Sequence, residues 1–308
     1  MSNDSDLFSR SATWFQTLQD RIVDALESLD GEATFLRDDW TRDGAADKGP
    51  VLGGFGRTRV LEGGAVLEKA GVNYSEVHGR FDAEYADRFP GDGRDFRACG
   101  ISLVLHPRNP NVPTVHMNYR RLSRGSTGWF GGGADLTPYV LFEDDAVHFH
   151  RVHRAACDAH PDVADYAAMK AACDGYFYLP HRNEARGIGG LFFDHLSDAP
   201  EATFAFVQDA GSAFLDAWLP IAERRVDLPY DDALRDWQLV RRGRYVEFNL
   251  VHDRGTQFGL RTGGRVESIL MSLPTLVSWR YDHHPEPGSN GAALVDVLQN
   301  PRDWLAEA

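Results

Sequence analysis

Apolar residues recur at steps of three and four along the first part of the chain. Within residues 7–30 they stand at Trp14, Leu18, Ile22, Leu26 and Leu29. This spacing places them on one face of a helix, and Gly31 directly afterwards is typical of a helix end. The pattern therefore predicts an amphipathic helix over residues 7–30 that packs against a core.

Strict alternation follows in two segments joined by a proline-rich connection. Gly100–His106 and Thr114–Leu122 alternate between apolar and polar residues, which predicts two strands. The prolines within residues 107–113 cannot continue a ladder, so this segment is expected to connect the strands. If the strands pair as a hairpin, one side of the sheet carries Ser102, His106, His116, Asn118 and Arg120. Simple exposure of one sheet face to solvent is the alternative explanation for such a polar side.

Other segments of the chain show either the helical period or the strand period. They predict helices over residues 143–159, 165–177 and 201–224, and strands over residues 58–67, 243–253 and 265–273. The glycine-rich stretch 124–133 predicts a loop that is mobile or lets a flat ligand approach the backbone. No linker interrupts the 308 residues, and a mixed α/β chain of this length forms one or two domains.

Composition and charge limit the classes of function. The share of hydrophobic residues, 43%, is that of a globular protein. The acidic N-terminus lacks the features of a secretory signal, and no run of about 18 apolar residues is present, so we expect a cytoplasmic protein. The odd number of cysteines, three, suits a reducing compartment. A net charge of −14 argues against a nucleic-acid partner or an anionic membrane.

The acidic side chains are mostly short, since aspartate outnumbers glutamate by 32 to 14, and only three residues are lysine. We interpret this bias, as a hypothesis, as an adaptation to high salt, because salt screens the repulsion among the acidic groups. A GC-rich genome, which favours codons for Arg and Asp, is an equally good explanation.

Arginines beside expected turns are the unusual feature of this acidic chain. They are Arg120, Arg121, Arg182, Arg186, Arg254, Arg261 and Arg265. Gly263 and Gly264 before Arg265 suit a turn whose N–H groups bind an anion, with the guanidinium as a clamp. Such a set fits a substrate with several carboxylates. The sequence lacks a Gly-x-Ser-x-Gly elbow, a His-Glu-x-x-His motif and a dinucleotide fingerprint, so hydrolase, zincin and simple NAD-dependent functions lack support.

Four long blocks of this sequence carry a resemblance to a known family, namely Gly100–Leu122, Trp129–Asp145, Tyr176–Asp194 and Arg244–Ser278. These blocks closely resemble the oxygen-dependent coproporphyrinogen-III oxidases, and the likeness spans most of residues 8–305. The resemblance implies oxidative decarboxylation of two propionates of coproporphyrinogen III to vinyl groups, giving protoporphyrinogen IX in haem biosynthesis. It implies molecular oxygen as co-substrate, without flavin, haem or nicotinamide. It also implies an α+β fold in which one domain, residues 1–308, holds a large antiparallel sheet flanked by helices.

The resemblance further implies roles for individual residues. The positions that match substrate-binding residues of the family are Ser102, Asn118, Tyr119, Arg120, Gly263, Gly264 and Arg265. His116 matches the proposed proton donor, and Asp253 with Arg254 matches a pair proposed to engage the pyrrole nitrogens and a carboxylate. His106, His116, His150 and His181 match histidines assigned to a divalent metal in bacterial members, while eukaryotic members are generally regarded as metal-free.

The resemblance also implies a homodimer, and His181 matches a residue linked to its interface. The apolar residues Phe248, Leu250, Ile269 and Met271 in the expected strands around Tyr245–Thr275 suit the same idea, since a symmetric dimer commonly covers such a surface.

The chemistry favours catalysis without a bound cofactor, because a porphyrinogen that loses a pyrrole N–H proton is electron-rich enough to react with oxygen. Asp253 is the expected acceptor of that proton or of the N–H groups, held ionised by pairing with Arg254. Two other classes stay open: a metal-dependent oxygenase that uses the four histidines as ligands, and a tetrapyrrole carrier without catalytic activity.

Overall fold

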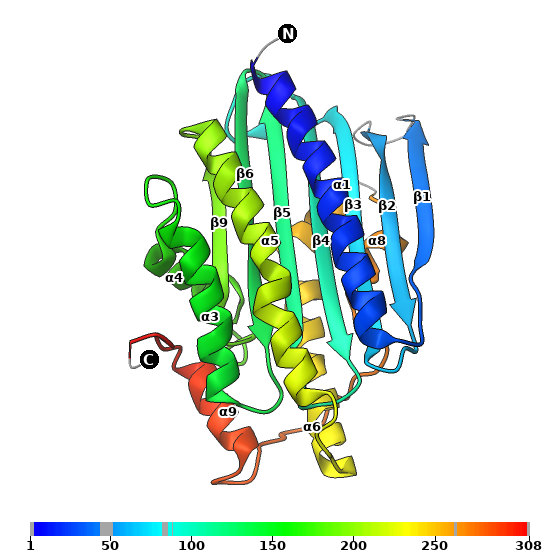
Figure 1. Cartoon of the computed structure of the whole chain (residues 1–308), viewed down its shortest axis with the longest axis vertical. Helices are drawn as coiled ribbons and strands as arrows, with labels where there is room; N and C mark the ends of the chain where they lie inside the picture. Colours follow the sequence, from blue (N-terminus) through cyan, green and yellow to red (C-terminus); the bar gives the residue numbers. More distant parts are fainter. Residues whose placement is uncertain (1–2, 44–51, 82–85, 88, 262–263, 307–308) are drawn as a thin grey trace.

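The computed structural model describes residues 3–43, 52–81, 86–87, 89–261 and 264–306. An antiparallel sheet of seven strands runs through this part of the chain in the order β1-β2-β3-β4-β5-β6-β9 (Figure 1). The strands are β1 (Leu36–Asp43), β2 (Leu52–Glu62), β3 (Leu67–Arg80), β4 (Asp95–Pro107), β5 (Thr114–Arg124), β6 (Thr127–Thr137) and β9 (Gly190–Leu196). Two short strands, β7 (Tyr178–Leu179) and β8 (Glu184–Ala185), pair with each other outside the sheet.

Helices lie on both faces of this sheet (Figure 1). One face is covered by α1 (Asn3–Asp30) and α5 (Pro200–Arg225), with α3 (Glu143–Asp158) and α4 (Tyr166–Tyr176) beside α5 and β9. The other face is covered by α6 (Asp232–Glu247), a π-helical turn η1 (Phe248–His252), α7 (Arg254–Arg261) and α8 (Val266–Leu270). Helix α9 (Asn290–Gln299) lies near the C-terminus. The architecture confirms the expected α+β fold.

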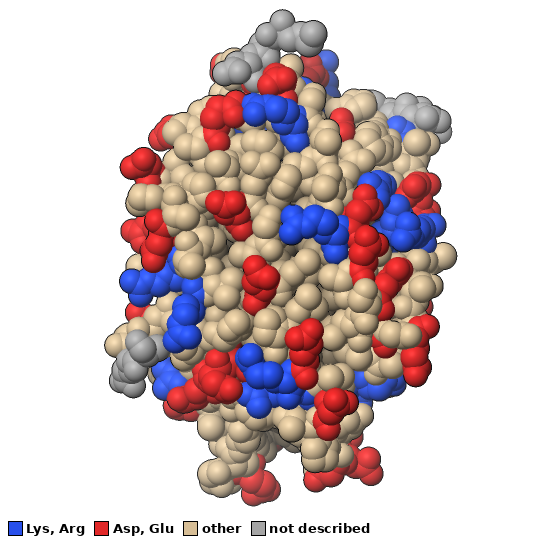
Figure 2. Space-filling model, in the orientation of Figure 1, with Lys and Arg blue, Asp and Glu red and all other residues tan. Residues whose placement is uncertain are grey.

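The outer surface over α1 and α5 carries mixed charge. Figure 2 shows acidic and basic side chains scattered over this face, with broad areas of other residues between them. No helix in the described ranges is long and apolar enough to cross a membrane.

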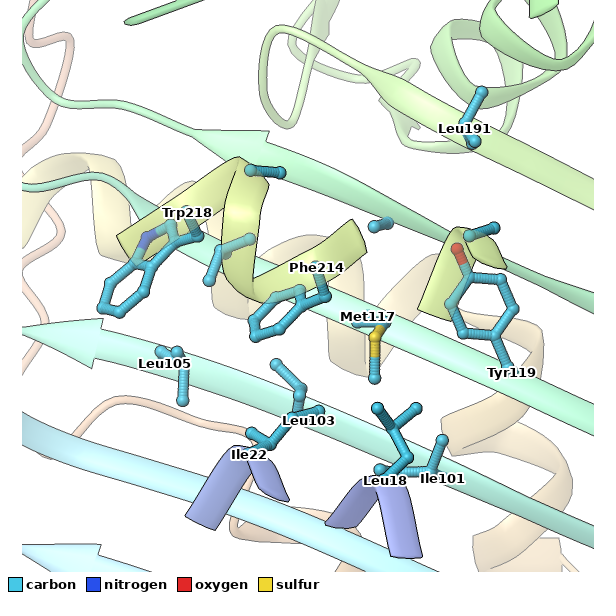
Figure 3. Packing of buried hydrophobic residues seen from close by; sticks show 14 of the residues in the cluster. Leu18, Ile22, Ile101, Leu103, Leu105, Met117, Tyr119, Leu191, Phe214 and Trp218 are labelled. Atoms are coloured by element: carbon cyan, nitrogen blue, oxygen red, sulfur yellow. The ribbon is translucent and has the colours of Figure 1, made fainter. Parts of the chain in front are cut away.

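The main hydrophobic core fills the space between the sheet and the two long helices. Leu18 and Ile22 of α1 and Phe214 and Trp218 of α5 meet the apolar side chains of β4 and β5 there (Figure 3). Burial of each such side chain stabilises the fold by about 1.5–3 kcal/mol. Because residues alternate along a strand, this packing directs the polar residues of β4 and β5 to the opposite face.

The N-terminal and central helix predictions are confirmed: α1, α3, α4 and α5 begin and end within a few residues of the expected bounds. The hairpin is also confirmed, since β4 and β5 pair antiparallel with Ser102 opposite Asn118.

Two predictions are wrong. The strands expected over residues 243–253 and 265–273 are the end of α6, η1, and α8, with α7 between them. The loop expected over residues 124–133 is mostly strand β6. Its glycines lie where neighbouring atoms leave no room for a Cβ atom: at Gly132 a Cβ would meet the Asn118 carbonyl oxygen at 2.4 Å. The glycine run therefore reflects close strand packing.

Candidate active site

A row of small polar residues crosses the sheet on the face opposite to the main core. The registers of successive strands pair Thr58, Asn73, Ser102, Asn118 and Gly133 in that order. The C-terminal segment covers the start of the row, since Asn73 Nδ2 donates to the Ser268 carbonyl oxygen at 2.6 Å. A polar sheet face that a second layer of chain partly covers is suited to binding a polar ligand, which argues against simple exposure to solvent.

Tyr119 lies apart from the other residues implied by the resemblance. Its side chain is fully buried on the core face of β5 (Figure 3), beside Phe193 with ring centroids 6.1 Å apart. Alternation along β5 places Asn118 and Arg120 on the polar face and Tyr119 on the other. The Tyr119 side chain is therefore not positioned to contact a ligand on the polar face.

His116 is held by a buried ion pair on the polar face. Its Nδ1 lies 2.8 Å from Oδ1 of Asp135, the residue opposite it on β6. Both oxygens of Asp135 also accept hydrogen bonds from Nη2 of Arg186, at 2.9 and 2.8 Å. Asp135 and Arg186 are almost completely buried, whereas 18% of the His116 side chain is exposed. The imidazole is thus the accessible member of this group of three.

The charges fix which nitrogen of His116 carries hydrogen. Burial opposes ionisation of Asp135, but Arg186 and His116 outweigh it and hold the pKa of that carboxyl below its usual value. An ionised carboxylate only accepts, so Nδ1 of His116 is the donor. Nε2 has no hydrogen-bond partner within the described ranges, and it is the nitrogen left for a ligand.

Aromatic rings surround the guanidinium of Arg186. Its Cζ lies 4.1, 4.5 and 4.8 Å from the ring centroids of Phe177, Tyr245 and Phe248. Its Nη1 donates to Oδ1 of Asn249 at 2.8 Å. Burial works against the charge, yet Asp135 raises the pKa of Arg186, so the pair stays ionised. The pair is bonded through Nη1 and Nη2 of Arg186, while its buried Nε has no hydrogen-bond partner in the described structure. The hydrogen bond from Nδ1 to Asp135 holds the His116 ring in one orientation.

Asp135 and Arg186 are the residues of this site that the sequence pattern does not indicate. Asp135 follows the glycine run that is expected to be a loop, and Arg186 is one of seven arginines beside expected turns. If residues 127–137 are instead treated as a strand beside 114–122, Asp135 becomes the acidic residue opposite His116. That register was the available signal.

Arg120 crosses the same face toward β9. Its Nη1 donates to Oδ1 of Asn118 at 3.0 Å, and its Nη2 lies 2.9 Å from Oδ1 of Asp194. Gly131 leaves the space for this pair, because a Cβ atom there would meet Asp194 Oδ1 at 2.6 Å and Arg120 Nη2 at 2.9 Å. The geometry fixes Arg120 beside the row of polar residues.

Asp253 and Arg254 stand at the start of α7. Asp253 caps this helix, since its Oδ2 accepts from the Thr256 N–H at 2.7 Å, and its Oδ1 accepts from the Tyr176 hydroxyl at 2.9 Å. The side chain of Arg254 lies over the Tyr176 ring, with Cζ 4.7 Å from the centroid. Among the described residues no ion pair joins Asp253 and Arg254, because the Asp253 carboxylate bonds to the Tyr176 hydroxyl and the guanidinium of Arg254 lies over the Tyr176 ring, so the expected pairing is wrong.

The expected anion-binding turn is only partly described, since Gly263 lies outside the described residues. The Gly264 N–H donates to the Gly259 carbonyl oxygen at 2.7 Å, so it is already used within the chain. Arg265 pairs with Asp38 of β1 at 2.5 Å and also donates to Ser268 Oγ at 3.3 Å. A substrate carboxylate would have to compete with Asp38 for this guanidinium.

The four histidines proposed as metal ligands are not brought together. Each has protein partners of its own: His106 contacts the Ser272 carbonyl oxygen and Thr114, His150 contacts Tyr166 and the Ile188 carbonyl oxygen, and His181 contacts Glu247 and His252. Burial lowers the pKa of both His106 and His150 to about 3, so these rings are neutral. The described residues contain no group of three or more acidic, histidine or cysteine side chains able to hold a metal ion. The donor set does not fit a four-histidine metal site, which corrects that expectation.

A comparison with protein families agrees with this geometry. The family model described as coproporphyrinogen III oxidase matches residues 10–304, nearly the whole chain. The match contains every strand of the sheet and every residue of the site described above. This protein is therefore a member of the coproporphyrinogen III oxidase family.

Proposed function

We propose that this chain catalyses the oxygen-dependent decarboxylation of two propionates of coproporphyrinogen III to vinyl groups, giving protoporphyrinogen IX. The observation that carries the proposal is the imidazole of His116, oriented by Asp135 and Arg186 on the polar face of the sheet. Family membership supports the substrate. The reaction needs a proton carrier and cations for carboxylates, and this face has both.

The overall chemistry balances with oxygen as the acceptor. Each propionate loses carbon dioxide, and the carbon next to the pyrrole ring loses one hydrogen together with two electrons. A carbon–carbon double bond forms between the two remaining side-chain carbons. Oxygen takes up the electrons and protons, and the electron-rich porphyrinogen reacts with it directly.

In this proposal His116 moves protons at its Nε2 atom. Because Asp135 accepts the hydrogen on Nδ1, the ring is held with Nε2 available to the reacting groups. A proton carried at Nε2 can then be given to reduced oxygen. This is the proton-donor role that the resemblance implies for His116.

In this proposal the arginines and amide side chains of the same face bind the substrate. Arg254 has an exposed guanidinium, and Arg120 lies next to the amide of Asn118. Ser102 and Asn118 supply short hydrogen-bonding groups for a macrocycle lying along the row. Asp253 keeps lone pairs for pyrrole N–H groups, and near-normal turnover by Asp253→Asn would remove it from the chemistry.

A homodimer remains part of the proposal. Phe248 and Met271 are buried within the chain, so these two members of the predicted apolar set are unavailable for an interface. Residues between 250 and 281 supply other exposed apolar side chains, namely Leu250, Val251, Leu260, Val266, Leu276, Trp279 and Tyr281. A second copy would cover such a surface. Sedimentation at micromolar concentration should give the dimer mass, and a monomer would contradict this part.

The test of the proposed function is an assay on coproporphyrinogen III that changes from anaerobic to aerobic conditions, with and without a chelator. Protoporphyrinogen IX should form only after oxygen enters, with oxygen consumed in step, in both the treated and the untreated enzyme. Binding without oxygen uptake would identify a carrier. Activity that a chelator abolishes and a divalent ion restores would identify a metal-dependent oxygenase.

A further inference from the structure

We propose that Tyr176 is a positioning residue that holds the guanidinium of Arg254 ready for a substrate carboxylate. Tyr176 is the last residue of α4 and lies next to Phe177, one of the rings around Arg186. The inference rests on the proposed function, because it assigns a partner to a residue of that same site.

The hydroxyl of Tyr176 joins the first two residues at the start of α7. It donates to Oδ1 of Asp253 at 2.9 Å and accepts from the backbone N–H of Arg254 at 3.2 Å. Burial and the charge of Asp253 raise the pKa of Tyr176 to about 12, so the hydroxyl keeps its proton and remains a donor. These two bonds fix where the Arg254 side chain leaves the backbone.

The ring of Tyr176 sets the direction of that side chain. It stacks on Phe192 with centroids 4.3 Å apart and planes 9° from parallel. Cζ of Arg254 lies 4.7 Å from the Tyr176 centroid and 5.9 Å from that of Phe192. Phe192 is opposite Gly133 on the polar face, at the end of the row that contains Asn118. The stack therefore forms a wall of the candidate site with a cation on it.

No carboxylate of the described residues pairs with the guanidinium of Arg254. The other three arginines of the site contact carboxylates of the chain: Arg120 with Asp194, Arg186 with Asp135, and Arg265 with Asp38. Arg254 is exposed and has no such partner among the described residues. Attraction to a ring face orders a guanidinium without using its N–H donors. A side chain ordered in advance loses less conformational entropy when it binds an anion.

A merely structural role for Tyr176, as packing between α4 and α7, predicts a different coupling with Arg254. If Tyr176 acts through Arg254, its removal should matter only while Arg254 is present. If it only packs, its removal should weaken binding equally in both backgrounds.

The experiment measures binding of coproporphyrin III, the fluorescent and unreactive tetracarboxylate, to the full chain. Tyr176→Leu should raise the Kd about five- to tenfold, the scale of a cation–π contact, and Arg254→Ala should raise it at least as much. The double variant should match Arg254→Ala alone. Tyr176→Phe keeps the ring and should raise the Kd less than Tyr176→Leu. Tyr178→Leu, which removes a neighbouring tyrosine bonded to Asn183, should leave the Kd unchanged.

Equal losses from Tyr176→Leu in both backgrounds would overturn the inference, as would an unchanged Kd in Tyr176→Leu. Because Tyr176→Leu removes packing, thermal unfolding of every variant is recorded. If Tyr176→Leu does not fold, the double-mutant cycle is made with Tyr176→Phe and Arg254→Ala instead. Turnover of coproporphyrinogen III by the wild type is measured separately. Its absence would reject the proposed function, whereas normal turnover with a failed cycle rejects only the role of Tyr176.

Discussion

At the scale of single residues, the buried and the accessible histidines differ in what their ring nitrogens contact. His106 and His150 are fully buried, and both nitrogens of each ring contact protein atoms. Only Nδ1 of His116 has such a partner in the described structure. Residue type alone does not distinguish these cases, because all three histidines match family histidines that are assigned to a divalent metal. The contacts of each ring give structural roles to the first two, and they leave Nε2 of His116 available for the proton transfer that we propose.

Replacement of His116 tests that assignment. His116→Ala should lower kcat by about 10²- to 10⁴-fold, the usual effect of losing a proton-transfer group, with little change in thermal stability. His284→Ala is the matched control, because 81% of that side chain is exposed. The rates are compared under saturating substrate. A His116→Ala enzyme within twofold of the wild type would exclude the imidazole from the chemistry.

At the scale of secondary-structure elements, prediction succeeded where one face of the element meets the main core. Helix α1 and strands β4 and β5 keep a clean period, since their alternate faces meet the core and the polar side. Their positions, and the polar face with Ser102 and His116, could therefore be predicted from the sequence.

Prediction failed where charged residues are buried. Arg241, Arg242 and Arg244 lie inside the C-terminal layer, where Arg242 pairs with Glu68 and Arg241 with Glu184. A hydrophobic pattern treats these buried arginines as polar surface, so the helical period of α6 does not show. The partner carboxylates are more than 50 residues distant in sequence, and no local pattern can indicate them.

Strand β6 allows a test of why glycine is required beside the site. Gly131→Ala would place a Cβ atom against Arg120 and Asp194. Both clashing atoms end flexible side chains, so the fold should adjust, with an unfolding free energy within about 1 kcal/mol of the wild type. The displaced Arg120 should raise KM about tenfold, the scale of one hydrogen bond to a charged group.

The control is Gly175→Ala in α4, where a Cβ atom has nothing within 4 Å. It should leave KM unchanged and stabilise the helix by about 0.5–1 kcal/mol. Equal KM values for both alanine variants would contradict the role of Gly131.

Glu247, at the end of α6, links three segments of the C-terminal layer. Burial opposes its charge, but hydrogen bonds from Arg182, His181 and Trp279 lower its pKa from 4.5 to about 2. A carboxyl whose folded pKa is lowered stabilises the fold above its unfolded pKa, and this contribution disappears as pH falls through the folded value. Glu247→Gln should therefore lower the Tm at neutral pH, and its difference from the wild type should shrink between about pH 4.5 and 2.

The exposed Glu286→Gln serves as the control and should leave Tm unchanged across the same pH series. A gap between the wild type and Glu247→Gln that stays constant down to pH 2 would contradict the charge pairing.

At the scale of the whole molecule, the net charge of −14 means that the excess acidic side chains repel one another. Figure 2 shows acidic groups at scattered positions on the face above α1 and α5. If the acidic composition reflects high-salt adaptation, the Tm should rise from low to molar salt as screening increases. Equal stability at both salt concentrations would instead favour genome composition as the cause.

In the proposed function, the oxygen-dependent reaction takes place on the polar face of the sheet. The most direct measurement is release of labelled carbon dioxide from coproporphyrinogen III carrying label in its propionate carboxyl groups, by the wild type and Asp135→Asn. We expect release of carbon dioxide only when oxygen is present. The rate should be about 10²- to 10⁴-fold lower in Asp135→Asn, because this variant no longer holds His116 in the required tautomer. Release without oxygen, or equal rates from the two proteins, would contradict it.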